Sequence, residues 1–228
     1  MTRTPTATAS PSPGPTQPPD LIFRDGFESG NLSIWTTSFT DGGDLSVSSS
    51  AALVGSYSLR AVIDDNNAIY VTDDSPNAET HYRARFYFDP NTITMSSSND
   101  YHIFYGYSGT STPVLRITIH HSGTSYQLQA ALRNDSSNWI NSAWVNISDA
   151  PHYIELDWRA STASGANNGS LTFWIDGGNP RANLTGVDND TRRIDRIRLG
   201  AVSGINTSTR GTTYFDAFES REQTYIGP

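Results

Sequence analysis

The chain has 228 residues, no cysteine and a formal net charge of −8, and all of its basic residues are arginine. Hydrophobic residues make up 36% of the sequence and charged residues only 17%, a balance typical of turn-rich, all-β extracellular proteins. The negative charge argues against general affinity for nucleic acid or anionic membranes. Without cysteine there are no disulfides or thiolate metal sites, and no apolar run is long enough to span a bilayer.

The first 20 residues differ in composition from the rest of the chain. Residues 1–20 alternate proline with small polar residues and contain no aromatic side chain, which favours an extended, semi-rigid linker. We interpret this segment as the tether of a module within a longer secreted or cell-surface protein. The alternative is an N-terminal arm that packs against a neighbouring subunit. Residues 21–228 are expected to form a single domain.

From residue 21 onward, apolar and polar residues alternate with a period of two, which is the pattern of a half-buried β-strand. In "HYRARFYF" the apolar face consists of Tyr82, Ala84, Phe86 and Phe88. The runs "SYSLRAVI", "VLRITIHH" and "YQLQAALR" alternate in the same way, and "IDGGNP" predicts a hairpin turn. No segment has a sustained helical period. About ten or more short strands predict an all-β fold, a two-sheet antiparallel β-sandwich of the jelly-roll type.

Three late segments carry a family resemblance. The stretches "NNGSLTFWIDGGNPRANLTG", "IDRIRLGAVSG" and "GTTYFDAFESR" resemble bacterial laminin-G-like modules of the concanavalin A-like lectin/glucanase superfamily. In addition, "DGFESGNLSIW" and "YFDAF" are similar to the first and last strands of calcium-containing carbohydrate-binding modules. The resemblance implies a β-sandwich. Its superfamily hosts lectins, glycosidases, lyases and structural modules, so it leaves the ligand open.

The motif Asp-x-Phe-Glu-Ser occurs twice, beginning at Asp25 and at Asp216. Nothing between the two copies recurs at a fixed period, which argues against duplication. In sandwiches of the kind that the chain resembles, the first and last strands commonly lie side by side in one sheet, and we interpret the two copies as these strands. Each Asp shares a strand face with aromatic rings, where an unpaired buried carboxylate is costly, and calcium prefers oxygen ligands. We predict a structural Ca²⁺ at Asp25 and Asp216, with Glu28 or a backbone carbonyl completing the shell. Alternatively, these carboxylates are solvated or paired with Arg24 and Arg221.

One enzymatic alternative is a glycoside hydrolase. The stretch "IELDW" places Glu155 and Asp157 on one strand face, as in the carboxylate row of laminarinase-like glycosidases. Retaining hydrolysis needs two carboxyl groups about 5 Å apart. The third acid of that family is absent here, because Arg159 stands where it would fall. We therefore interpret this stretch as an outward-facing strand.

A second enzymatic alternative is a polysaccharide lyase. Four consecutive predicted strands carry polar faces that we expect to line one concave sheet, namely Arg83, Arg85, His102, Arg116, His120, Gln127 and Gln129. Lyases of the alginate-cleaving type use Arg and Gln to neutralise a uronate carboxylate, and His or Tyr to move the proton. Their Gln-Ile-His triplet is replaced by "TIHH" in this sequence.

The interpretation that we favour is non-catalytic glycan binding or adhesion at a cell surface. Exposed aromatic rings stack on sugars while polar side chains bind the hydroxyl groups. The expected ligand-binding set is Arg83, Arg85, Tyr87, His102, His120 and Trp139, with no catalytic residue. Trp35, Trp158 and Trp174 lie in regular strand patterns and are expected in the core. The alternative from another class is a structural surface subunit that assembles with copies of itself.

Overall fold

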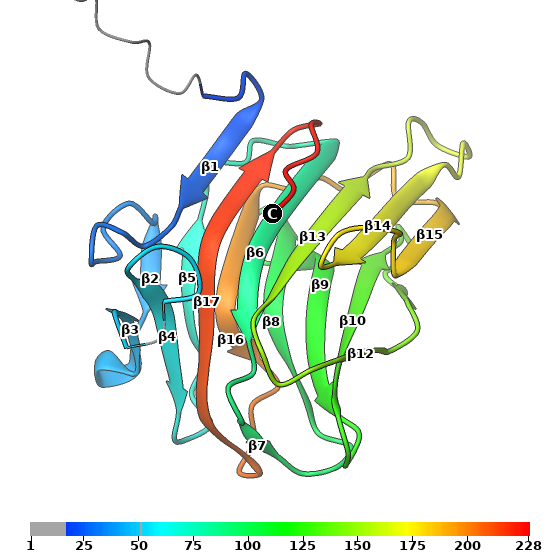
Figure 1. Cartoon of the computed structure of the whole chain (residues 1–228). Helices are drawn as coiled ribbons and strands as arrows, with labels where there is room; N and C mark the ends of the chain where they lie inside the picture. The colour runs from blue at the N-terminus through cyan, green and yellow to red at the C-terminus, as the bar shows by residue number, and fades with distance from the viewer. Residues whose placement is uncertain (1–16, 51) are drawn as a thin grey trace, which may run out of the picture.

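The computed structural model describes residues 17–50 and 52–228 as two antiparallel β-sheets packed face to face (Figure 1). This arrangement confirms the predicted two-sheet antiparallel β-sandwich. The prediction of a linker or arm falls mostly on residues 1–16, which lie outside the described residues. Within the described ranges, no helix has the length and apolar character needed to cross a membrane.

The front sheet, which is nearer to the viewer in Figure 1, has nine strands within the described residues. Its main path is β15 (Ala182–Val187), β14 (Gly169–Ile175), β13 (His152–Arg159), β6 (His81–Asp89), β17 (Thr209–Arg221), β4 (Ser58–Ile63) and β3 (Leu45–Ser48). Two further strands, β1 (Leu21–Asp25) and β7 (Thr94–Met95), each pair with β17 outside this path. A short 3-10 helix, η1 (Asp41–Gly43), precedes β3.

The back sheet has eight strands in the same part of the chain. Its main path is β11 (Trp139–Asn141), β10 (Tyr126–Arg133), β9 (Thr112–His121), β8 (Asp100–Ser108), β16 (Arg196–Ser203), β5 (Ile69–Asp73) and β2 (Thr37–Phe39). The remaining strand, β12 (Val145–Ile147), pairs with β10.

The period-two pattern places one side of each long strand in the core between the sheets. The apolar face predicted for β6, which is Tyr82, Ala84, Phe86 and Phe88, is fully buried. On β9 the apolar residues Leu115, Ile117 and Ile119 are fully buried as well. Burying one such large side chain stabilises the fold by about 1.5–3 kcal/mol. The polar residues that alternate with them therefore face outward, away from the core.

The two Asp-x-Phe-Glu-Ser segments lie next to each other, because β1 pairs antiparallel with β17. In this register Asp25 lies opposite Phe218. The motif copies thus belong to the first and last strands of one sheet, as predicted. At the second copy β17 contains a bulge between Asp216 and Glu219, and Ala217 has a positive φ of 46°.

Some strands that follow one another in the sequence lie in different sheets. In the front sheet β6 pairs with β13 and β17, whereas in the back sheet β8 pairs with β9 and β16. The chain passes from one sheet to the other after Asp89, through β7. The expectation that the outward faces of β6, β8, β9 and β10 line one sheet is therefore wrong.

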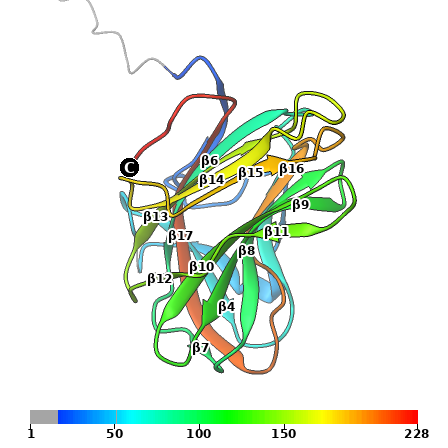
Figure 2. The ribbon, with the colours of Figure 1, turned by 90° about the vertical axis from the view of Figure 1, so that its right-hand side faces the viewer.

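The C-terminal segment, residues 222–228, folds back over the outer face of the front sheet (Figures 1 and 2). Asp20 fixes its start, because its carboxylate accepts hydrogen bonds from the amides of Gln223 (3.0 Å) and Thr224 (2.6 Å). Glu155 fixes its end, since its carboxylate oxygens accept hydrogen bonds from the amides of Ile226 and Gly227, each at 3.0 Å. We call residues 222–228 the strap.

The strap explains an error in the predicted core. Trp35 and Trp158 are buried as expected, with 4% and 0% of their surface exposed. Trp174, in contrast, points away from the core on β14, where its alternating neighbours Phe173 and Ile175 point inward. Its ring packs against Tyr225 of the strap at a centroid distance of 6.4 Å. A later segment of the chain thus covers this outward-facing ring.

Candidate functional site

The predicted ligand-binding residues divide between the two outer faces of the sandwich. Arg83, Arg85 and Tyr87 lie on β6 in the front sheet, while His102 and His120 lie on β8 and β9 in the back sheet. The sixth residue of the set, Trp139, begins β11 in the back sheet. The sheets lie between these two groups, so the six residues do not form one platform.

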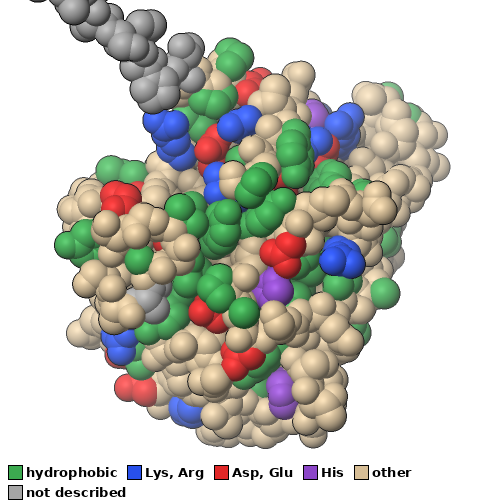
Figure 3. All heavy atoms as spheres, in the orientation of Figure 1, with side chains coloured by type: hydrophobic (Ala, Val, Ile, Leu, Met, Phe, Trp, Pro, Cys, Tyr) green, Lys and Arg blue, Asp and Glu red, His purple; other side chains and the backbone are tan. Residues whose placement is uncertain are grey.

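On the front-sheet outer face, the arginines are matched by carboxylates. Arg83 pairs with Glu155 and Asp157, and Asp157 also pairs with His81 and Arg159. These bonds, together with charges from the same groups, lower the pKa of Asp157 to about 2, although burial acts in the opposite direction. Figure 3 shows acidic and basic side chains intermingled on this face. Its positive charge is therefore locally neutralised.

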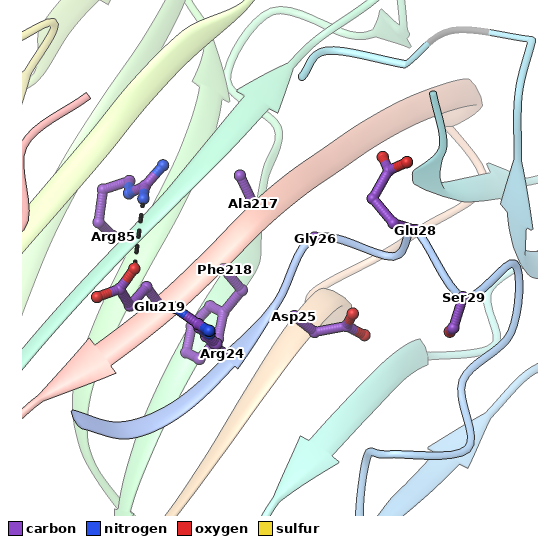
Figure 4. Close-up of a pocket in the computed structure, with 9 residues that line it drawn as sticks. All are labelled: Arg24, Asp25, Gly26, Glu28, Ser29, Arg85, Ala217, Phe218 and Glu219. Atoms are coloured by element: carbon purple, nitrogen blue, oxygen red, sulfur yellow. Dashed lines mark ion pairs between the residues drawn. The ribbon is translucent and has the colours of Figure 1, made fainter. Parts of the chain in front are cut away.

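Arg85 belongs to the same balanced face. Its guanidinium lies 3.8 Å from the Glu219 carboxylate, which also pairs with Arg221 at 2.6 Å. Its Cζ atom lies 5.6 Å from the centre of the Tyr87 ring. Arg85 and Glu219 line a hollow of about 310 Å³ beside β1 and the bulge of β17, together with Arg24, Asp25, Gly26, Glu28, Ser29, Ala217 and Phe218 (Figure 4).

Two of the predicted calcium ligands line this hollow, but their side chains point in different directions (Figure 4). The Asp25 oxygens accept hydrogen bonds from the Phe27 amide and from the indole Nε1 of Trp35, both at 2.7 Å. Glu28 Oε1 accepts hydrogen bonds from the amides of Ser56 and Tyr57, at 2.9 and 3.1 Å. Each carboxylate thus fixes a loop.

Asp216, the third predicted ligand, also binds backbone amides. Its Oδ2 accepts hydrogen bonds from Leu53 (3.1 Å) and Val54 (2.8 Å), and its Oδ1 accepts one from Ala217 (2.6 Å). Burial raises the pKa of this carboxyl to about 6, and the nearby charge of Glu28 acts in the same direction. A bound cation reduces the repulsion between carboxylates that lie close together.

Within the described residues, the carboxylates that approach one another closely enough to share a metal are Asp135, Asp188 and Asp190. Asp25, Glu28 and Asp216 are not such a group. Thr191 and Arg192 already bind Asp135. The donor set at the β1–β17 junction therefore fits a cation only in part, through Glu28 and Asp216.

The back-sheet outer face has a different electrostatic character. Arg116 on β9 and Arg198 on β16 are half-buried, and neither forms an ion pair with a carboxylate anywhere in the described ranges. The Nε atom of each guanidinium is buried without a hydrogen-bond partner, as are those of Arg83 and Arg85 on the front sheet, so the difference between the faces is the missing carboxylate. An unpaired, partly desolvated guanidinium attracts an anion more strongly than one with a carboxylate beside it.

Aromatic rings hold these two arginines in place. The Cζ atom of Arg116 lies 4.3 Å from the centre of the Trp139 ring. The Cζ atom of Arg198 lies between two rings, 4.5 Å from the centre of Tyr70 and 5.0 Å from that of Tyr107. Such cation–π contacts fix a guanidinium while leaving its N–H groups free to donate.

His102 lies beside this arginine pair and is neutral at physiological pH. Burial, followed by the charge of Arg116, lowers its pKa to about 4. Its Nδ1 atom is 2.9 Å from the Thr118 hydroxyl, and its ring lies 5.0 Å from that of Tyr105. His120, further along the same face, packs against the ring of Trp144 at 4.8 Å.

Sequence reasoning found part of this face. Arg116, His102 and His120 were expected on a polar sheet, and they do share the back-sheet outer face. Trp139 was expected to bind ligand from a loop-like setting, and it lies on β11 against Arg116. Arg198, Tyr70 and Trp144 were missed. The alternation of "RIRLG", with the buried residues Ile197 and Leu199 on either side of Arg198, was a signal that could have placed this arginine outward.

Comparison with known proteins shows the fold. The chain is similar in structure to the binding domain of Paraclostridial Mosquitocidal Protein 1, with a TM-score of 0.59 and 11% identity over 91% of this chain and 50% of that chain. It is similar to alginate lyase vAL-1 from Chlorella virus, with a TM-score of 0.54 and 14% identity over 83% of this chain and 100% of that chain.

A third similar structure is the ligand-binding domain of botulinum neurotoxin serotype D in complex with N-acetylneuraminic acid. Its TM-score is 0.52, and the identity is 11% over 89% of this chain and 50% of that chain. The chain therefore spans half the length of the two toxin chains. No protein-family model matches the sequence, and no curated protein matches it significantly. At these identities the shared property is the jelly-roll β-sandwich, and function does not follow from it.

Proposed function

We propose that the chain is a non-catalytic, extracellular glycan-binding module that takes acidic glycans on the outer face of the back sheet. The observation that carries this proposal is the pair Arg116 and Arg198, whose guanidinium groups have aromatic neighbours and no carboxylate partner in the described part of the chain. On the other outer face, Arg83 and Arg85 have carboxylate partners.

The chemistry of this face fits a sugar that carries a negative charge. Tyr105 is partly exposed and offers a ring for stacking, while Gln129 and His102 add polar groups. The net charge of −8 does not prevent anion binding, because charges further than about 10 Å away are screened at physiological salt. Since a flexible sugar loses entropy on binding, we expect dissociation constants of about micromolar to millimolar.

The second candidate function is an acidic-polysaccharide lyase, and one observation favours it. His102 is a neutral imidazole beside Tyr105 and Arg116, so a potential base, a potential acid and a potential carboxylate neutraliser lie together. We rank it below binding, because a neutral histidine between a threonine hydroxyl and a tyrosine ring also fits plain structural packing. A glycoside hydrolase is not proposed, since amides of the strap bind both oxygens of Glu155.

Isothermal titration calorimetry tests the proposed function. We expect polyuronates and sialylated glycans to bind, and neutral β-glucans to bind at least about tenfold more weakly. Arg116→Gln should weaken binding of the acidic glycans by about tenfold or more, since it removes a charged donor and keeps the side-chain stem. Arg85→Gln is the matched control on the opposite face and should leave the affinity unchanged.

Three outcomes would contradict this proposal. Unsaturated product, detected by ultraviolet absorbance during the polyuronate titrations, would establish the lyase. Equal loss of binding in the Arg85 control would move the site to the front sheet. No heat with any glycan, together with ordered assemblies in concentrated protein, would favour the self-assembling surface subunit.

We also propose a structural Ca²⁺ near the β1–β17 junction, supported by the proximity of the Glu28 charge to Asp216. A cation that binds only the folded state stabilises it by mass action. We expect EDTA to lower the melting temperature by a few degrees and Asp216→Asn to remove most of this response, as measured by differential scanning fluorimetry. Identical melting curves with and without chelator would exclude the ion.

A further inference from the structure

The two unpaired arginines lie in one row that crosses the strands of the back sheet. Arg198 on β16 lies directly opposite Tyr105 on β8, and Tyr105 lies directly opposite Arg116 on β9. Neighbouring strands are about 4.8 Å apart, so the Cα atoms of the two arginines are about 10 Å apart. Tyr105 separates them. We call Arg198, Tyr105 and Arg116 the Arg–Tyr–Arg row.

The positions of both guanidinium groups are set before any ligand binds. Arg116 lies over Trp139 and donates from Nη2 to the side-chain oxygen of Asn141 at 3.1 Å. Arg198 lies between Tyr70 and Tyr107. Little rotamer entropy is lost when a side chain that is already packed forms a new bond, so each arginine can hold an anion at a defined place.

The row contrasts with the residues along the strands. From Arg116, the next outward residues on β9 are Thr118 and His120, and the outward residue on β8 beside Thr118 is His102, which is neutral. The other arginine in contact with Trp139 is Arg133, whose guanidinium donates to the backbone oxygen of Ser137 at 2.9 Å. Arg133 forms no ion pair within the described residues either, so its charge adds to that of Arg116. On β16 the neighbouring outward arginine, Arg196, pairs with Asp74, whose charge also interacts with Arg198. Arg116 and Arg198 are the two arginines aligned directly across β8.

From this geometry we infer that the site recognises two anionic groups on one extended glycan, which lies across the strands. The groups must be more than about 10 Å apart, because Arg116 reaches away from Tyr105, toward Asn141 on β11. The inference rests on the proposed function and specifies its ligand class as an acidic oligosaccharide, not a single acidic sugar. Arg116 binds one oxyanion and Arg198 the other, and a sugar ring between them stacks on Tyr105. The oxyanion is the carboxylate of a uronic acid or the sulfate of a sulfated sugar, since a guanidinium binds both.

Calorimetry with four probes tests this inference. The probes are a uronic acid monomer, an unsulfated oligouronate of four residues, a sulfated oligosaccharide of equal length and a neutral oligosaccharide of equal length. We expect the anionic oligomers to bind the wild-type protein at least about tenfold more tightly than the monomer, because two charged contacts act within one ligand. Comparison of the carboxylated and sulfated probes identifies the preferred oxyanion.

Variants of the row give the sharper readout. Arg116→Gln and Arg198→Gln keep the stem of each side chain against its rings while they remove the charge. Each should lower the oligomer affinity about tenfold, toward that of the monomer, and the double variant should bind the oligomer no better than the neutral probe. Gln127→Ala, on β10 of the same face, is the uncharged control and should bind as the wild type does.

The outcomes separate this inference from the proposed function. If the monomer binds as tightly as the oligomers and only Arg116→Gln loses affinity, the site holds one anion; the inference is then wrong and the proposed function stands. If no acidic probe binds, both are wrong. Melting temperatures within about 2 °C of the wild type confirm that the variants fold. Should either glutamine variant fail to fold, the four probes with the wild-type protein decide. The inference then holds if the anionic oligomers bind at least about tenfold more tightly than both the monomer and the neutral oligomer, and it is wrong if they do not.

Discussion

Replacing Glu155 with alanine is expected to lower the free energy of unfolding by about 3 kcal/mol or more. The carboxylate is fully buried, and it accepts hydrogen bonds from Arg83 at 3.1 Å and from two amides of the strap at 3.0 Å each. Its removal leaves the two amides without their acceptor and Arg83 with only Asp157 as a partner. In a domain of this size the loss corresponds to a fall of roughly 6–12 °C in melting temperature.

Urea unfolding measures this loss, and two variants bracket it. Glu155→Gln keeps the shape and one acceptor oxygen, so it should cost less than the alanine variant. Glu222→Ala changes an exposed acid at the start of the strap and should alter the stability by less than about 0.5 kcal/mol. Hydrogen exchange at the amides of Ile226 and Gly227 should accelerate in Glu155→Ala. If that variant unfolds within about 1 kcal/mol of the wild type, the strap is not held through Glu155.

The sequence predicted the strands and the layers because one residue in two along each strand faces the core. The expected inward face of β6 is the buried one, and the hairpin predicted at "IDGGNP" connects β14 to β15 through Gly177 and Gly178, which both have positive φ. Pairing of the first and last strands followed from the sandwich fold that the chain resembles. The strand faces and the hairpin needed local information only, whereas the pairing of the two ends needed knowledge of the fold.

The assignment of strands to sheets could not be obtained in this way. Strands that follow one another in a sequence are often neighbours, and that expectation placed Arg83 and His102 on one surface. In a jelly roll the chain alternates between layers, so β6 and β8 expose their polar residues on opposite sides of the molecule. Period two defines two faces for each strand, but it carries no information about which strand comes next in space.

The ion-pair partners of the arginines could not be predicted from the sequence either. Arg83 and Arg198 each alternate with apolar residues on their strands, yet Arg83 has two carboxylate partners and Arg198 pairs with none in residues 17–50 and 52–228. The difference arises because β13, which pairs with β6, contributes Glu155 and Asp157 to the front-sheet outer face. Contacts of this kind depend on segments that lie some 70 residues apart.

Lowering the pH should change the stability of the fold in opposite directions through His102 and through Asp216. His102 has a folded-state pKa of about 4 against an ordinary value of 6.5, so between these values the unfolded chain binds the extra proton and acid destabilises the fold. Asp216 has a folded-state pKa of about 6 against an ordinary value of 3.8, so in that window the folded chain binds the extra proton and acid stabilises the fold. In the wild-type protein these two contributions largely cancel.

Single substitutions separate the two contributions. Between about pH 7.5 and about pH 4.5, each group changes the free energy of unfolding by about 2 kcal/mol in EDTA-treated protein. His102→Gln lacks the group through which acid destabilises the fold. On acidification its free energy of unfolding should therefore change by about 2 kcal/mol more favourably than that of the wild type. Asp216→Asn lacks the group through which acid stabilises the fold, so its free energy of unfolding should change less favourably than that of the wild type by a similar amount. Urea unfolding at both pH values measures each difference, and every other titrating group is common to the three proteins. If all three proteins share one pH dependence, neither His102 nor Asp216 is desolvated as the fold requires.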